Sequence, residues 1–144
     1  MANDLMRFSV AMHEDLLMEF DQMVARRGIM KNRSEVVRDL IRAALVEEVC
    51  EVPGTHVYGS LTVVYDHHAP DLRDKLHGIQ HDYCENIVCT THVHVDHHTC
   101  LEVIILQGEV ELVQRVADQV LGLKGVETGS LSLTTTGEQS RSVQ

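Results

Sequence analysis

Residues 91–100 read T-H-V-H-V-D-H-H-T-C, and this stretch predicts a hairpin of two strands that carries metal-ligand chemistry. His92 and His94 stand two apart among alternating β-branched residues, and a strand points every second side chain to the same face. Both imidazoles therefore aim in one direction. The polar segment 96–99 predicts a turn that brings Cys100 into the neighbouring strand beside them. Two nitrogens and one sulfur then converge on one face.

The pattern on both sides of this hairpin predicts an alternation of strands and helices. We expect strands at 58–66, 86–95, 101–108 and 126–134, a helix at 70–81 with Pro70 in its first turn, and a helix at 109–121. This βαββαβ order is typical of the ferredoxin-like, or ACT-like, topology. The interpretation is a domain over 54–134, followed by a polar tail, 135–144, that we expect to be disordered.

A different pattern occupies the N-terminal part of the chain. Residues 5–12, L-M-R-F-S-V-A-M, alternate as a half-buried strand does, and a helical stripe follows over 14–27, with Gly28 in the C′ position. Ser34 is expected to cap a second helix. One strand and two helices in a module over 1–50 bury too little apolar surface to be stable alone. Two chains are therefore expected to pair their strands into a ribbon that fits a DNA major groove and exposes Arg7, Ser9 and Ala11.

Charge separates the two modules. The formal net charge is −10, but residues 1–49 hold seven Lys/Arg against nine Asp/Glu, whereas residues 50–144 hold five against thirteen. The N-terminal module is thus nearly neutral, which leaves DNA binding open to it. No apolar run approaches the length of a membrane span, and the N-terminus lacks a signal-peptide pattern, so we expect a cytoplasmic protein without a membrane partner. In that compartment clustered cysteines are expected to be ligands rather than disulfides.

The N-terminal order of elements, with Asn32-Arg33-Ser34-Glu35 at the second helix start, resembles a ribbon-helix-helix DNA-binding domain. With Q-H at 80–81, H-V-H at 92–94 and C-L-E at 100–102, nearly the whole chain resembles the nickel-responsive transcriptional regulators, the NikR-like family. The resemblance implies an α+β fold, a homotetramer built as a dimer of dimers, and one Ni(2+) per subunit. The ligands it implies are His92, His94 and Cys100, with His81 from the partner subunit.

The same resemblance implies a repressor of metal uptake genes that binds double-stranded DNA at a palindromic operator. Its DNA contacts fall on Arg7, Ser9 and Ala11 of the ribbon, and on Arg33 and Ser34, where backbone N–H groups at a helix N-terminus can meet a phosphate. A weaker cation site is implied at Glu35 and Asp39.

The residues alone leave the metal open. Three imidazoles and a thiolate suit Ni(II) or Cu(II) in a tetragonal site and Zn(II) in a tetrahedral one, and Co is a further possibility. Glu102 shares a strand face with Cys100 and is expected to hold the free N–H of a ligating histidine. Cys89, at odd spacing, is expected to face away into the core, and Cys84 to be a free thiol.

Most other histidines are expected not to bind metal. His77 stands one helical turn before His81, a spacing that can clamp zinc, but it lacks further support. His97 and His98 fall in the turn and are expected to be solvated. No local cluster surrounds the rest, namely His13, His56, His67 and His68.

Two other function classes compete with the regulator. One is an antitoxin-like ribbon-helix-helix DNA binder whose C-terminal part grips a protein partner. The other is a small metalloenzyme with an open coordination position for water. The sequence has neither an H-E-x-x-H motif nor a Gly-rich phosphate loop, so we expect no enzyme.

Overall fold

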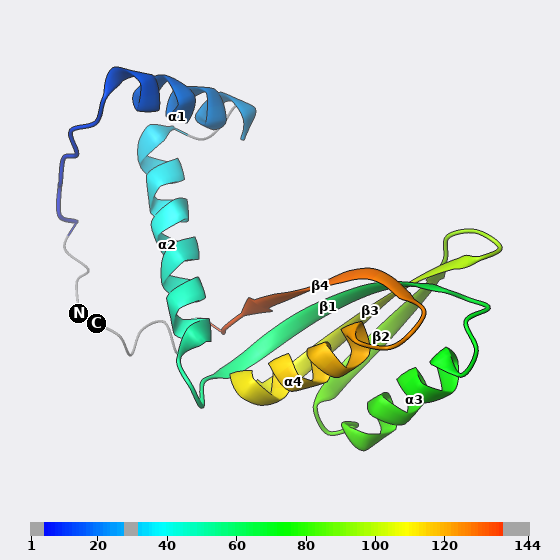
Figure 1. Cartoon of the computed structure of the whole chain (residues 1–144). Coiled ribbons are helices and arrows are strands. Elements are labelled where there is room, and N and C mark those ends of the chain that lie inside the picture. Colours follow the sequence, from blue (N-terminus) through cyan, green and yellow to red (C-terminus); the bar gives the residue numbers. More distant parts are fainter. Residues whose placement is uncertain (1–4, 28–31, 137–144) are drawn as a thin grey trace. The chain divides into compact units, whose positions relative to one another are not determined.

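The computed structural model describes residues 5–27 and 32–136, and the chain divides into two compact units, Met1–Arg42 and Ala43–Gln144 (Figure 1). The first unit holds α1 (Glu14–Arg26) and the start of α2 (Arg33–Glu51), which confirms the two predicted helices. No residue of α1 is fully buried, and Leu16 is 56% exposed. Gly28, the predicted C′ residue, lies outside the described residues.

The start of α2 is capped by Asn32 rather than by Ser34. The Asn32 side-chain oxygen accepts a hydrogen bond from the Glu35 backbone N–H at 3.0 Å, and the Glu35 carboxylate accepts one from the Asn32 N–H at 3.0 Å. This reciprocal pair is a capping box. Ser34 already lies inside the helix, so the prediction that it caps was wrong.

The predicted strand over 5–12 does not form in the single chain. Residues 5–13 have no regular secondary structure, and the side chains meant for the buried face are exposed, among them Met6 at 87% and Phe8 at 71%. A strand needs a hydrogen-bonding neighbour, and the described sheet contains none for this segment. The prediction of a half-buried strand was therefore wrong for a single chain. The ribbon formed by two chains stays a prediction.

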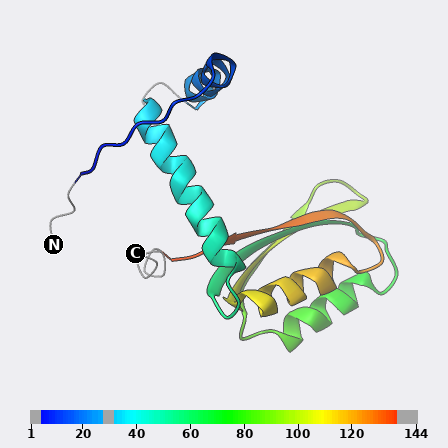
Figure 2. The same ribbon diagram turned by 60° about the vertical axis from the view of Figure 1, so that its left-hand side comes forward.

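The second unit is a four-stranded sheet covered on one face by two helices. Its elements are β1 (His56–Asp66), α3 (Leu72–Asp82), β2 (Ile87–His94), β3 (Thr99–Glu109), α4 (Val110–Leu121) and β4 (Val126–Thr134). The strand order is β2-β3-β1-β4 and every neighbouring pair is antiparallel. Helices α3 and α4 lie side by side on the same face (Figures 1 and 2). The predicted ferredoxin-like topology is confirmed.

Alternation along the strands decides which face is covered. On β1 every second residue from Val57 to Tyr65 is buried, and these side chains pack with Val113 and Val116 of α4. The aliphatic side chains among them, Val57, Leu61 and Val63, each contribute roughly 1.5–3 kcal/mol relative to exposure. Among the described residues, no helix covers the opposite face of the sheet. Cys89 pairs with Ile105 on that face and is exposed, so its predicted place in the core was wrong.

Helix α3 starts later than its proline suggests. Asp71 is the residue before the helix and has a positive φ of 61°, so Pro70 lies before the first turn rather than in it. The predicted turn over 96–99 is confirmed, because Val95 and Asp96 donate backbone hydrogen bonds to the Thr99 carbonyl. Thr135 and Thr136 have no regular structure, and the rest of the predicted disordered tail lies outside the described residues.

Candidate metal centre

The strand register places His94 directly opposite Cys100 on β2 and β3. The Cys100 side chain is fully buried, and its Sγ lies 3.5 Å from His94 Nδ1. On the other side of β3, the pairing of β1 with β3 places Tyr65 opposite Cys100. The hairpin predicted from the sequence thus delivers an imidazole and a thiol to the helix-covered face of the sheet.

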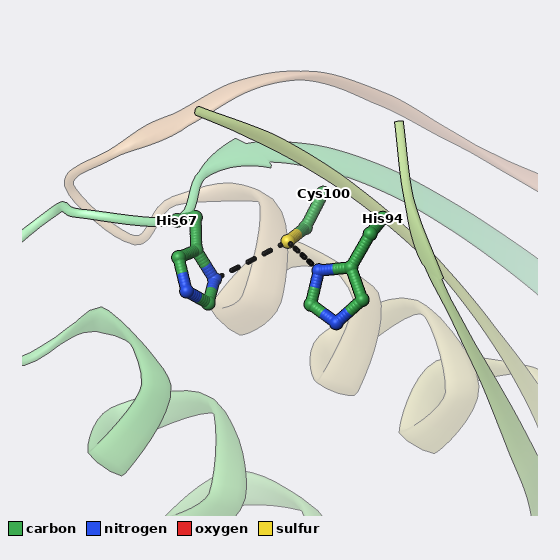
Figure 3. A group of neighbouring side chains, drawn as sticks. All are labelled: His67, His94 and Cys100. Atoms are coloured by element: carbon green, nitrogen blue, oxygen red, sulfur yellow. Dashed lines mark hydrogen bonds between the residues drawn. The ribbon is translucent and has the colours of Figure 1, made fainter. Parts of the chain in front are cut away.

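A third ligand group, His67, completes the cluster shown in Figure 3. His67 Nδ1 lies 3.4 Å from Cys100 Sγ, and the ligand atoms of His67, His94 and Cys100 all lie within 4.8 Å of one another. The backbone N–H of His67 donates to the His98 carbonyl at 2.6 Å, which holds the end of β1 against the hairpin. Sequence reasoning missed His67 because its partners are distant in the chain. The signal was its position two residues after Tyr65, the residue paired with Cys100.

The spacing of these atoms fits a shared divalent ion. Metal–nitrogen bonds near 2.0–2.1 Å and metal–sulfur bonds near 2.3 Å put cis nitrogen and sulfur ligands about 3.1 Å apart at a right angle and about 3.6 Å apart at a tetrahedral angle. The two observed separations, 3.4 and 3.5 Å, fall between these limits. Imidazole nitrogens with a thiolate also form the donor set that Ni, Cu and Zn prefer.

His92 is oriented by a buried hydrogen-bond network. The Tyr65 hydroxyl donates to Glu102 Oε2 at 3.1 Å and lies 3.2 Å from His92 Nδ1, while Gln80 Nε2 donates to Glu102 Oε1 at 2.6 Å. Because the hydroxyl has one proton and gives it to the carboxylate, it accepts from His92 Nδ1–H. Nε2 of His92 then keeps its lone pair for a metal. Glu102 is linked to His92 through Tyr65, because its own oxygen is 3.6 Å from the His92 ring nitrogen. The direct hydrogen bond from a histidine to Glu102 that the sequence led us to expect is thus replaced by one through the phenol.

Burial and nearby charges set the protonation of the cluster. Burial raises the pKa of the Cys100 thiol; Arg73 opposes this, and Glu102 and Asp96 add to it. Burial, followed by the charge of Arg73 and the neighbouring imidazoles, lowers the pKa of His67. Burial beside Glu102 raises the pKa of Tyr65, so the phenol stays a donor at neutral pH. Without metal the cluster therefore holds a protonated thiol and a neutral His67.

The remaining predicted ligand, His81, is not part of this cluster within the described chain. It lies exposed in the last turn of α3, while its neighbour Gln80 points to Glu102. His77 and Cys84 are also exposed, and so are His97 and His98, as predicted. One chain thus brings together the ligand atoms of His67, His94 and Cys100. His92 lies beside this group, with its ring 4.7 Å from that of His94, and His81 is exposed and apart from it.

Comparisons with known proteins agree with this architecture. Residues 58–134 match the model of the NikR C terminal nickel binding domain, and residues 6–48 match that of the ribbon-helix-helix protein, copG family. The chain belongs to the NikR family of nickel-responsive regulators. This family consists of DNA-binding, metal-responsive transcription regulators and not of enzymes, so the regulator, and not the metalloenzyme or the antitoxin, is the class to which the chain belongs.

Relatives cover nearly the whole NikR-family chain. A protein of Geobacter sulfurreducens named "Putative nickel-responsive regulator" is 47% identical over 94% of this chain and 97% of its own length. One of the same name from Solibacter usitatus is 48% identical over 95% and 98%. The structure of an uncharacterized protein from Thermotoga maritima aligns with 56% of this chain and 100% of that one, at a TM-score of 0.51 and 12% identity, which shows the fold alone.

The DNA-binding residues expected for a ribbon-helix-helix module are exposed, with one qualification for Arg33. Arg7, Ser9, Ala11 and Ser34 are all accessible. The Arg33 guanidinium instead makes a bidentate ion pair with Asp21 of α1, with both hydrogen bonds at 2.6 Å. This hydrogen bond raises the pKa of Arg33 and lowers that of Asp21. In the single chain Arg33 ties α1 to α2.

The second cation site expected at Glu35 and Asp39 is not assembled among the described residues. Glu35 takes part in the capping box of α2, and Asp39 pairs with Arg42 at 3.3 Å.

Within residues 5–27 and 32–136, which the structure describes, no helix is long and apolar enough to cross a membrane.

Proposed function

We propose that this chain binds nickel and that the bound ion controls its affinity for DNA. The ligands are His92, His94 and Cys100 of one subunit with His81 of a partner copy, one ion per subunit of a homotetramer. The regulated DNA is a palindromic operator at metal uptake genes in the cytoplasm, which the loaded tetramer represses. The observation that carries this proposal is the 3.5 Å approach of the buried Cys100 sulfur to the His94 imidazole on paired strands.

His81 is assigned to the partner copy because of where α3 holds it. Its imidazole is exposed and separate from its own chain's cluster, so it is available to a second subunit. The open face of the sheet supports association of the C-terminal units, since Val88, Val93 and Val95 are 45–57% exposed there and on the adjoining hairpin. A bound nickel ion would supply a cross-link between subunits.

The N-terminal module also favours association with a second copy of the chain. Apolar side chains of residues 5–16 are exposed in one chain, including Leu5 at 85% and Val10 at 63%. Pairing two such segments into a ribbon would bury one face and present Arg7, Ser9 and Ala11 to the major groove, with the N-terminus of α2, at Arg33 and Ser34, against a phosphate. Nickel acts on this equilibrium only if the arrangement of ribbons that fits the operator binds the ion more tightly than other arrangements do.

Gel-shift titration of an operator fragment, with nickel and with chelator, tests the regulatory part. Tight binding should require nickel, and Arg7→Ala should weaken binding by roughly 1–3 kcal/mol if it contacts a base edge. Arg26→Ala, in the last turn of α1 and outside the ribbon, is the control for general loss of positive charge. Equal affinity with and without chelator contradicts the proposal.

Mixing variants tests whether the site is shared. His81→Ala and Cys100→Ala should each lose the four-ligand site. Co-refolded together, they should regain it in the fraction of sites that draw both intact ligands from different chains. Mixed oligomers, verified by mass, that recover no nickel binding place the fourth ligand in the same chain. His67→Ala then identifies it, because His67 is the imidazole already 3.4 Å from the sulfur.

A further inference from the structure

Residues 52–55, the joint between α2 and β1, are fastened to the first turn of α4 (Figures 1 and 2). The Gly54 backbone N–H donates to both carboxylate oxygens of Glu111, at 3.0 Å and 3.2 Å. The Val110 N–H donates in turn to the Thr55 carbonyl at 2.9 Å. One contact runs from the joint to the helix and the other from the helix to the joint, so the two together hold the joint against α4.

The conformation of the joint depends on a glycine. Gly54 has a positive φ of 77°, and a Cβ at this position would meet nothing within 4 Å. Glycine is therefore required here by the backbone conformation and not by lack of space. Its N–H is thus presented to Glu111 by a turn that other residues adopt only at a cost.

Apolar packing holds the end of α2 next to the joint. Cys50 is 4% exposed and belongs to the core of the second unit, and Val46, one turn earlier, packs against that core. Helix α2 begins at Arg33 in the first unit and ends at Glu51 in the second. Its last turns are thus anchored in the second unit by side chains, and the joint that follows them is anchored by Glu111.

The joint and the candidate metal centre lie at opposite ends of one strand ladder. All eleven residues of β1 pair with β3, from His56 opposite Glu109, beside the joint, to Asp66 opposite Thr99. Cys100 lies at the far end, about 30 Å from the joint at 3.4 Å per residue. Strand β3 passes directly into α4, whose first turn holds the joint. Rigid elements of this kind carry energetic coupling between distant sites.

We propose that Glu111 is a positioning residue that holds the joint, so that the direction of α2, and with it the DNA-binding module, follows the state of the metal centre. This inference rests on the proposed nickel-dependent regulation and names the contact that couples its two halves. A ligand shifts an equilibrium only through its different affinity for two states, and here the states differ in the angle of α2 at the joint. A loose joint would let α2 take many directions whether or not nickel is bound.

Gel-shift titration of an operator fragment with the full-length Glu111→Ala protein tests this contact. With nickel, the variant should bind about 3- to 10-fold more weakly than the unmodified chain, the range expected for loss of one hydrogen bond in water. With chelator, the two proteins should bind alike. Nickel affinity, followed by sulfur-to-metal absorption, should stay the same, because no metal ligand is changed.

Glu111→Gln is the matched control for charge. It removes the same negative charge from the first turn of α4 but keeps an oxygen that can accept from the Gly54 N–H, so it should retain most of the nickel effect on DNA binding. A nickel effect that survives Glu111→Ala undiminished overturns the proposal. So does an equal loss in the Ala and Gln variants, because that loss would come from the charge and not from the hydrogen bond.

Gly54→Ala reaches the same joint while Glu111 and its charge remain. Alanine disfavours the positive φ, so this variant should reproduce the loss seen with Glu111→Ala. The double variant should lose less than the product of the two single losses, because both act on one contact. Losses that multiply in full overturn the shared joint.

Amide hydrogen exchange separates the joint from the regulation that it serves. The Gly54 N–H should exchange faster in Glu111→Ala than in the unmodified chain, whereas Glu127→Ala, which removes an exposed carboxylate from β4, should leave it unchanged. Equal exchange in Glu111→Ala and the unmodified chain overturns the proposal. If the unmodified chain binds DNA equally with and without nickel, the proposed regulation is refuted, while the exchange result still decides whether Glu111 holds the joint.

Discussion

Replacing Tyr65 with Phe tests whether the buried network holds His92 ready for metal. The substitution removes one oxygen, which donates to Glu102 at 3.1 Å and lies 3.2 Å from His92 Nδ1. The aromatic ring stays, so the core around β1 keeps nearly all of its volume. Glu102 retains the hydrogen bond from Gln80, and its oxygen sits 3.6 Å from His92, too far for a good hydrogen bond.

The expected loss is specific to metal binding. Without the hydroxyl, His92 Nδ1–H has no close acceptor, and the tautomer with a free Nε2 is no longer selected. Removing such an outer hydrogen-bond partner typically costs about 10- to 100-fold in metal affinity. Leaving such a donor without an acceptor costs about 1–3 kcal/mol, and one decade of affinity is 1.4 kcal/mol, so the two magnitudes agree.

Competition between the protein and a chelator for Ni(II), followed by sulfur-to-metal absorption, measures this affinity. Tyr58→Phe is the matched control, because Tyr58 lies on the same strand with its side chain on the other face and its ring against His56. Urea unfolding of both metal-free variants separates a loss of folding free energy from a loss of metal affinity. If Tyr65→Phe and Tyr58→Phe bind nickel equally well, the network does not position His92.

Other consequences of the structure are open to direct measurement. Cys100→Ser should abolish the sulfur-to-metal absorption while circular dichroism of the metal-free protein is preserved. Because burial raises the pKa of Cys100, its proton must leave on binding, so nickel affinity should rise by about tenfold per pH unit near neutral pH for this one proton, as isothermal titration in several buffers can show. The same raised pKa makes the metal-free fold most stable below the ordinary thiol pKa, and the free energy of unfolding should fall as pH rises through the folded value. Asn32→Ala should lower the free energy of unfolding by about 1 kcal/mol through loss of the cap, whereas Ser34→Ala should change it little. Gly129→Ala should cost about 1–3 kcal/mol in the same assay, because its Cβ would meet Leu121 and the Thr62 carbonyl.

Local patterns predicted most of the second unit. Strand alternation and helical spacing depend on neighbours in sequence, and they located all four strands and both helices of the domain. His94 and Cys100 were predictable as a pair because a short hairpin decides which residues face each other. His67 was not, since its approach to Cys100 depends on the pairing of β1 with β3, which joins residues 33 positions apart.

The errors in the first unit have a different cause. Periodicity reported an apolar face at residues 5–12, but it does not say which molecule covers that face, and one chain leaves Phe8 71% exposed. The prediction that Cys89 lies in the core was wrong for the same reason. Its odd spacing from His92 shows which face of the strand it occupies, but not whether another layer of structure covers that face. The cap was assigned to Ser34 because Asn32 and Ser34 are both favourable capping residues. Only Asn32 has a Glu three residues later, which completes the capping box.

The exposed apolar side chains and the exposed His81 share one property, because a single chain offers none of them a partner within the part of the molecule that the structure describes. A single chain buries the helix-covered face of its sheet and leaves unsatisfied the open sheet face, the N-terminal segment and one imidazole expected to bind metal. Association of copies would remedy all of these at once, and a metal ion bound across the contact would favour one arrangement by its difference in affinity between arrangements. Hydrophobic association without metal would then hold the subunits together, and the ion would only have to select among their arrangements. A coupling of 1–3 kcal/mol, about the strength of one or two of the hydrogen bonds around Glu102, is enough to change affinity for DNA by roughly 5- to 150-fold.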